Sequence, residues 1–227
     1  MRHFAPFLIY SSAFVLAAIA GSINALGLLG VNRRGVSHLT GALTDAGVHA
    51  ARSGEGSPLN GFLIVLAFLF GSMLSGLIVG DATLRLGRRY GVGLVLEGLL
   101  LIAAYVVARG DLSHATSYLT AIACGMQNAL ASNFSGAVLR TTHMTGVVTD
   151  LGILLGQALR GLPVDTWRLW LFLSLLGGFF TGAMAGAMLH GWLGPEALLL
   201  PAAAVIVGGS GYWIWVHRRR PVPQGKA

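Results

Sequence analysis

Six long apolar stretches separate the few charged residues of the chain, and they decide what it can fold into. They cover residues 4–29, 59–80, 92–108, 115–139, 167–189 and 197–216. Each approaches the roughly 20 residues that an α-helix needs to cross the hydrocarbon core of a bilayer. An open sheet would leave backbone groups unpaired in lipid, and a barrel strand would alternate apolar and polar residues. The stretches are continuous, so the sequence predicts an all-α integral membrane protein of about six transmembrane helices.

The composition supports this class and excludes others. Charged residues make up only 10% of the 227 residues, against roughly 25% in soluble domains. The net charge of +7 is spread between apolar stretches and forms no patch with interleaved aromatics, so nucleic acid is not an expected partner. Cys124 is the single cysteine, which excludes an intramolecular disulfide framework and a Cys-rich metal site. Walker, His-Glu-x-x-His and Gly-x-Ser-x-Gly motifs are absent from the sequence, so no cofactor or metal is predicted.

The distribution of basic residues predicts the orientation in the membrane. With six spans and an inner N-terminus, eleven of the 15 Lys and Arg residues fall on the inner side. The four on the outer side are Arg33, Arg34, Arg52 and Arg109. Cytoplasmic loops carry the excess of Lys and Arg in most membrane proteins. We therefore expect both termini in the cytoplasm, with residues 218–227 as a basic tail.

An internal repeat divides the rest of the chain. Residues 38–47 read His-Leu-Thr-Gly-Ala-Leu-Thr-Asp-Ala-Gly, and residues 143–152 read His-Met-Thr-Gly-Val-Val-Thr-Asp-Leu-Gly. Asn24 and Asn128 precede the two blocks in similar contexts. Two patterns of small residues follow them at an offset of 106, namely Ser72, Gly76 and Gly80, and Gly178, Gly182 and Gly186. The sequence thus predicts two homologous halves, 1–110 and 111–217, each with three spans.

An odd number of spans per half places the second half upside down relative to the first. Such inverted repeats are common in transporters, whose site lies near the bilayer midplane. The alternative is eight helices in parallel halves, if both repeated blocks crossed the membrane. The first block, within residues 36–51, is too short for that.

The paired blocks and the preceding Gln127-Asn128-Ala129 resemble the YoaK-type family of bacterial membrane proteins. The leading Arg140-Thr141-Thr142 is the most specific part of the resemblance, and Ser37 departs from it where the second block has Thr142. The resemblance covers nearly the whole chain and implies six spans in the bacterial inner membrane. The family is a domain of unknown function, so the resemblance implies neither a substrate nor site residues.

The repeated polar residues are the candidate site. On a helix, residues seven apart share a face, which places a histidine and an aspartate together in each block. Carboxylates at membrane depth are costly unless paired or hydrated, so we expect a central pocket where both aspartates lie close together. The candidate substrate-binding or ion-binding residues are Asn24, His38, Thr40, Thr44, Asp45, Gln127, Asn128, His143, Thr145, Thr149 and Asp150.

Other roles are open for these positions. The blocks could be polar joints, with Ser37 and Thr142 as helix caps, or His and Asp could bind a metal. Glu97 lies within an apolar stretch and could carry a proton, because a buried carboxyl tends to be neutral. It could equally donate one hydrogen bond within the bundle. The two patterns of small residues predict close helix packing, within the chain or across a homodimer.

Three functions fit these patterns. The first is a secondary transporter or permease for a small solute, with the two blocks facing each other across a central pocket. The second is a membrane-embedded enzyme that uses a His-Asp pair as acid and base. The third is a non-catalytic membrane scaffold. The sequence lacks the recognisable nucleophile or metal motif that an enzyme would need. A scaffold would not explain why both aspartates are retained. The transporter is therefore the leading hypothesis.

Overall fold

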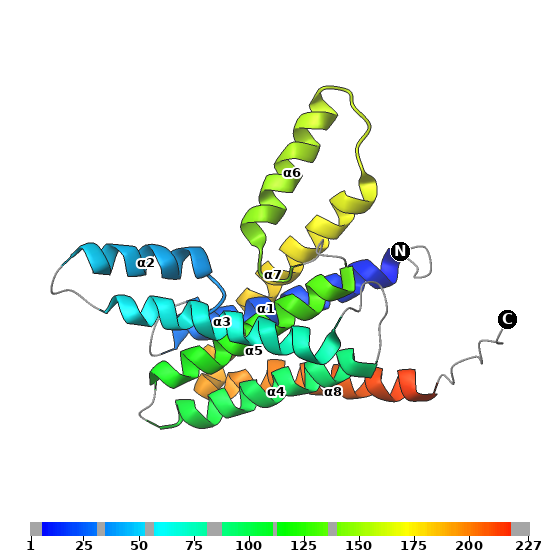
Figure 1. Ribbon diagram of the computed structural model, residues 1–227. Helices are drawn as coiled ribbons and strands as arrows, with labels where there is room; N and C mark the ends of the chain where they lie inside the picture. The colour runs from blue at the N-terminus through cyan, green and yellow to red at the C-terminus, as the bar shows by residue number, and fades with distance from the viewer. Residues whose placement is uncertain are drawn as a thin grey trace.

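The computed structural model describes residues 6–30, 35–52, 57–80, 88–110, 113–135 and 140–218. All regular secondary structure in these residues is helical (Figure 1), which confirms the predicted all-α class. The helices are α1 (Pro6–Leu29), α2 (Leu39–Ala51), α3 (Pro58–Val79), α4 (Arg88–Ala108), α5 (Ser113–Ser135), α6 (Met144–Leu159), α7 (Thr166–Leu193), the 3-10 helix η1 (Gly194–Leu198) and α8 (Leu199–Arg218). Of the predicted basic tail, 218–227, only Arg218 lies within the described residues.

The predicted spans overlap α1, α3, α4, α5, α7 and α8, while the repeated blocks open the shorter helices α2 and α6. Within the described residues, four continuous helical stretches are long and apolar enough to cross a membrane by length and composition. They are Phe7–Leu29, Pro58–Val79, Arg89–Ala108 and Thr166–Arg218. The last of them contains α7, η1 and α8 in series. The chain is therefore a membrane-like helical protein.

α5 is absent from these four stretches because Ser, Thr, Gln and Asn residues lower its hydropathy. The helix lies inside the bundle, in contact with α1, α3 and α4. Ala121, Cys124 and Met126 are fully buried there. Ser117, Thr120, Gln127 and Asn128 are buried as well, and polar residues are accommodated at membrane depth by facing protein in this way.

Close backbone contacts join α1 to α7. Gly178, Gly182 and Gly186 of α7 all lie against the backbone of α1, and a Cβ on Gly182 would overlap with the Ala18 carbonyl group. Small residues spaced by four permit such an approach. These three glycines occupy the packing positions that their spacing predicts.

The pattern on α3 needs a correction. No atom of the described residues lies within 4 Å of a Cβ built on Gly76 or Gly80, and Gly80 ends α3 with a φ of 64°. Ser72 does reach α5, since its hydroxyl donates to the Gly125 carbonyl oxygen at 3.0 Å. The closest approach of α3 to α5 is at Gly71, where a Cβ would overlap with the α5 backbone.

The two halves align differently here from the alignment that the sequence predicted. The crossing of α3 with α5 is equivalent to the crossing of α7 with α1 when each residue of α3 is matched with the residue of α7 that lies 111 positions later. The sequence predicted an offset of 106. The matched pairs are Phe68 with Phe179, Gly71 with Gly182 and Met73 with Met184. Small residues recur so often in both helices that two registers five residues apart both align glycines.

The directions of the helices follow from their contacts. α1 and α7 run parallel, because successive contacts rise together along both chains. α3 and α5 are also parallel, with Tyr118 donating to Asn60 Oδ1 at 3.3 Å near their beginnings. α4 and α8 run antiparallel, since Gly91 lies near Gly209 and Gly98 near Ala202. Each of these pairs joins the two predicted halves, so the halves interlock.

Candidate solute-binding cavity

Asn24, late in α1, anchors the segment that precedes α2. Its Oδ1 accepts hydrogen bonds from the Ser37 backbone N–H at 3.2 Å and from the Ser37 hydroxyl at 3.0 Å. The chain therefore leaves α1 at Leu29 and returns to the level of Asn24 before α2 begins. A side-chain amide in an apolar helix is stabilised by such a partner.

Asn128 makes the equivalent arrangement in the second half. Its Oδ1 accepts hydrogen bonds from the Thr142 N–H at 3.1 Å and the Thr141 hydroxyl at 2.9 Å, and its Nδ2 donates to Thr142 Oγ1. The neighbouring Gln127 is 1% exposed. Its Nε2 donates to the Leu16 carbonyl oxygen at 3.4 Å, and its Oε1 lies 3.5 Å from the Thr141 hydroxyl. Both asparagines are thus anchors for the turn before a short helix.

Ser37 and Thr142 therefore do not cap these helices. The N-cap positions are His38 and His143, and neither side chain makes a capping hydrogen bond within the described structure. Serine and threonine both place a hydroxyl within reach of the asparagine amide. This shared contact explains why the first block tolerates a serine where the second has a threonine.

Each histidine ring lies over the glycine three residues later. A Cβ on Gly41 would overlap with His38 Cδ2, and a Cβ on Gly146 would overlap with the His143 ring. The glycine gives the ring the space that a side chain would fill. The two residue types recur together in both blocks because one accommodates the other.

The beginnings of α2 and α6 meet at one cavity of about 510 Å³. Residues of both blocks and of α3 and α5 line this inter-block cavity. They are Ser37, His38, Leu39, Thr40, Phe68, Ser72, Asn128, Ala129, Ser132, Arg140, Thr142, His143, Met144 and Thr145. Five predicted site residues are among them, from two segments about a hundred residues apart.

Asp45 and Asp150 are not among these lining residues, which corrects the expectation that the two carboxylates share the central pocket. Both side chains are exposed. Asp150 instead lines a neighbouring cavity of about 420 Å³, together with Arg140, His143 and Phe172. The reason is geometric: α2 and α6 begin at the inter-block cavity and run away from it, so a residue seven positions along lies about 10 Å from its start.

The other predicted residues have local roles. The hydroxyls of Thr44 and Thr149 donate to the carbonyl oxygens of Thr40 and Thr145, each at 2.9 Å and within its own helix. Glu97 is fully buried in α4, and neither carboxylate oxygen has a hydrogen-bond partner among the described residues. It lines neither cavity, so its role as a proton carrier stays a prediction.

Arg140 and Thr141 were not among the predicted site residues. Arg140 is the one arginine among the described residues that line the inter-block cavity, and Thr141 is an anchor partner. The signal was present, because both belong to the Arg-Thr-Thr segment before the second block. In the described part of the chain, no three His, Cys, Asp and Glu side chains gather to hold a metal ion.

Comparison with known proteins places the chain in a family. Residues 12–210 match the family described as "Protein of unknown function (DUF1275)", and the chain belongs to that family. No curated protein and no solved structure matches the chain.

Proposed function

We propose that this DUF1275 protein is a secondary transporter or permease for a small solute, with the inter-block cavity as its binding site. The observation that carries the proposal is that the starts of both repeated blocks line one cavity. A cavity between repeats, lined by the beginnings of short helices, is a common design of transporter sites. Its volume of about 510 Å³ lies in the range of small-molecule sites.

The proposal includes six membrane spans and inverted halves. Its support is that equivalent helices run in opposite directions. α4 is antiparallel to α8. α1 is antiparallel to α5, because Gly30 lies near Thr116 while Ile9 lies near Ala131. α3 runs with α5 and α7 with α1, so the third pair is antiparallel as well.

The proposed orientation places both termini in the cytoplasm. The beginning of α1 and the end of α8 lie at the same end of the bundle (Figure 1), as an even number of crossings requires. The excess of Lys and Arg on that side gives the direction. The resemblance to YoaK-type proteins adds the bacterial inner membrane to the proposal.

The lining favours a solute with negative charge. Arg140, two imidazoles and several hydroxyls face the inter-block cavity, and its lining within the described residues includes no Asp or Glu. α2 and α6 both begin there, and the first N–H groups of a helix carry partial positive charge. A small inorganic anion or carboxylate matches this surface better than a cation does.

The scaffold alternative is compatible with the same asparagine anchors, because they would also hold a structural joint between helices in place. A joint, however, gives no reason for a polar cavity between the two blocks. A scaffold would lack the solute movement that the transporter proposal requires, so uptake separates the two.

The test is uptake by proteoliposomes of labelled sulfate, phosphate and acetate, with tetraethylammonium and glycerol for comparison. We expect at least one anion to enter faster than into protein-free liposomes. Arg140→Gln should slow that uptake about tenfold, because a hydrogen bond to a charged group contributes roughly 1.5–3 kcal/mol. Arg160→Gln, at the end of α6 and outside both cavities, is the matched control. Entry of the cation or of glycerol alone would overturn the charge assignment, and entry of no probe would overturn the transporter.

A further inference from the structure

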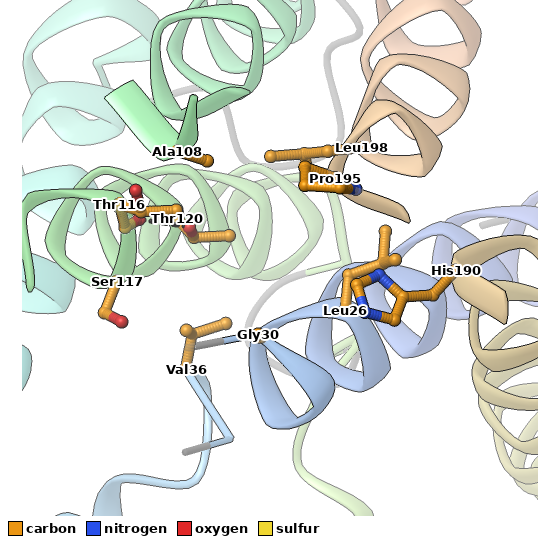
Figure 2. Close-up of a pocket in the computed structure, with 11 residues that line it drawn as sticks. Leu26, Gly30, Val36, Ala108, Thr116, Ser117, Thr120, His190, Pro195 and Leu198 are labelled. Atoms are coloured by element: carbon orange, nitrogen blue, oxygen red, sulfur yellow. Dashed lines mark hydrogen bonds between the residues drawn. The ribbon is translucent and has the colours of Figure 1, made fainter. Parts of the chain in front are cut away.

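Two more cavities lie at opposite ends of the bundle. The first end cavity, of about 90 Å³, contains Gly30 and Ala108 from the ends of α1 and α4 (Figure 2). The second end cavity, of about 380 Å³, contains Ile9 and Tyr90 from the beginnings of the same two helices. The inter-block cavity is lined by neither pair, and Phe68 and Ser72, at the middle of α3, do line it. It therefore lies between the levels of the two end cavities.

The repeat relates the two end cavities. Thr116 and Thr120 of α5 line the first, and Ser12 and Leu16, each 104 residues earlier on α1, line the second. The same relation holds for residues of α1 at the first end cavity. Gly27 lines the first end cavity, and its counterpart on α5, Ala131, lines the second end cavity. The two end cavities are therefore equivalent under the internal repeat, and they lie at opposite ends of the bundle.

Two dipeptides separate the end cavities from the inter-block cavity. Val36 lines the first end cavity, whereas the next residue, Ser37, lines the inter-block cavity. In the second half, Thr141 lines the second end cavity and Thr142 lines the inter-block cavity. These are the segments that the asparagine anchors hold, so the same two side chains fix both partitions.

We infer that the two end cavities are the mouths of one solute path through the inter-block cavity, and that residues 36–37 and 141–142 are its two gates. This rests on the proposed function. Asn24 and Asn128 keep the gates closed by holding them against α1 and α5. When water replaces the asparagine as the hydrogen-bond partner of one dipeptide, that dipeptide is free to move. Its movement connects one mouth to the binding site.

Both gates are held by their anchors, but the two mouths differ in size. The second end cavity is about four times larger than the first, at about 380 Å³ against about 90 Å³. In the narrow first cavity, Thr116 Oγ1 is buried without a hydrogen-bond partner among the described residues (Figure 2). A buried hydroxyl is normally satisfied, so water or a polar solute group belongs there. The outer mouth is thus the narrower of the two, and the cytoplasmic mouth is the wider.

Single-cysteine accessibility tests the path without knowledge of the solute. Cys124 is fully buried and is first replaced by alanine. A membrane-impermeant methanethiosulfonate reagent is then applied to intact cells or to inverted vesicles that carry Pro195→Cys or Ser12→Cys, at two exposed residues that line the first and the second end cavity. We expect Pro195→Cys to react only from the outside and Ser12→Cys only from the cytoplasmic side. Leu77→Cys, on a largely exposed apolar surface of α3, should react from neither. Reaction of both mouth cysteines from one side overturns the path.

The gates are tested with Ser132→Cys, which places a thiol at the inter-block cavity. Asn24→Ala should speed its reaction from the outside, and Asn128→Ala should speed it from the cytoplasmic side. Ser37→Ala, which removes one of the two bonds to Asn24, is the milder variant should Asn24→Ala fail to fold. Unchanged labelling rates in the folded variants, or fast labelling with both anchors intact, would overturn the gates. These outcomes do not depend on uptake of any anion, so failure of the gates and failure of the proposed function are distinguishable.

Discussion

The two short helices begin alike and then diverge. Both follow an asparagine-anchored turn, and both have a histidine at the N-cap. α2 lies along α3, whereas α6 projects from the bundle together with the beginning of α7 (Figure 1). The anchored turn and the histidine at the N-cap therefore determine how each helix starts, and other residues determine where it packs.

We expect this difference to depend on one position of the partner helix. Gly61 of α3 lies so close to α2 that an added Cβ would be 2.5 Å from the Ala42 carbonyl oxygen and 2.9 Å from Ala46 Cβ. The counterpart of Gly61 at the offset of 111 is Phe172. That ring is buried between α6 and α7 and lines the cavity beside Asp150. A phenyl ring in place of a glycine keeps the two helices apart.

The first prediction concerns the crossings where the halves agree. Gly182→Leu and Gly71→Leu should each cost more than about 3 kcal/mol of unfolding free energy, above the usual range for overpacking, because the overlapping atoms are backbone. Gly76→Leu, with no described atom near its Cβ, should change stability little. SDS titration in detergent micelles measures all three. Equal losses of unfolding free energy for Gly76→Leu and Gly182→Leu would contradict the offset of 111 and support the offset of 106.

The second prediction tests why the two short helices pack differently. Gly61→Phe places on α3 the residue that α7 has at the equivalent position, and the added ring should force α2 from its place. We expect a loss of about 1–3 kcal/mol, the usual cost of overpacking, and faster proteolysis of the segment that contains α2. Val65→Phe, one turn further on α3 and half-buried, controls for the added ring. A stable Gly61→Phe variant with a protected α2 would show that this glycine does not hold the helix.

The third prediction compares the anchors. Among the described residues, Asn128 makes three hydrogen bonds, one of them with the hydroxyl of Thr141, which is 1% exposed, whereas Asn24 makes two. A typical hydrogen bond contributes about 1 kcal/mol, and a buried group left unsatisfied costs more. Asn128→Ala should therefore lower stability by about 1 kcal/mol more than Asn24→Ala in the same SDS titration. Equal losses would mean that the Thr141 contact adds nothing.

The sequence predicted the helices and the polar repeat, because both depend on local patterns. Apolar stretches of fixed length gave the long helices, and the matching blocks identified His38 and His143 at one cavity. The partners of Asn24 and Asn128 could not be predicted. They lie 13 or 14 residues away across a turn, and no helical periodicity links residues on opposite sides of a turn.

The predicted aspartate pair failed for a similar reason. His38 is the N-cap of α2 and Asp45 lies within that helix, but the direction in which α2 leaves the cavity is a tertiary property. It depends on contacts such as that of Gly61 with Ala42. The register of the small residues on α3 was equally undetermined, because glycines recur at several spacings along both helices.

The smallest expected effect comes from exchanging the anchor hydroxyls between the halves. Ser37→Thr and Thr142→Ser each keep an oxygen that can bond the asparagine amide, so each should change stability by less than about 0.5 kcal/mol. Thr142→Val keeps the shape and removes the hydroxyl that Asn128 Nδ2 contacts, so it should cost about 1 kcal/mol. SDS titration of the three variants side by side separates the hydroxyl from the methyl group. A loss above about 1 kcal/mol for Ser37→Thr, as large as the loss of one hydrogen bond, would show that the first turn has no room for the methyl group. The two halves would then differ already at their anchors, before α2 and α6 diverge.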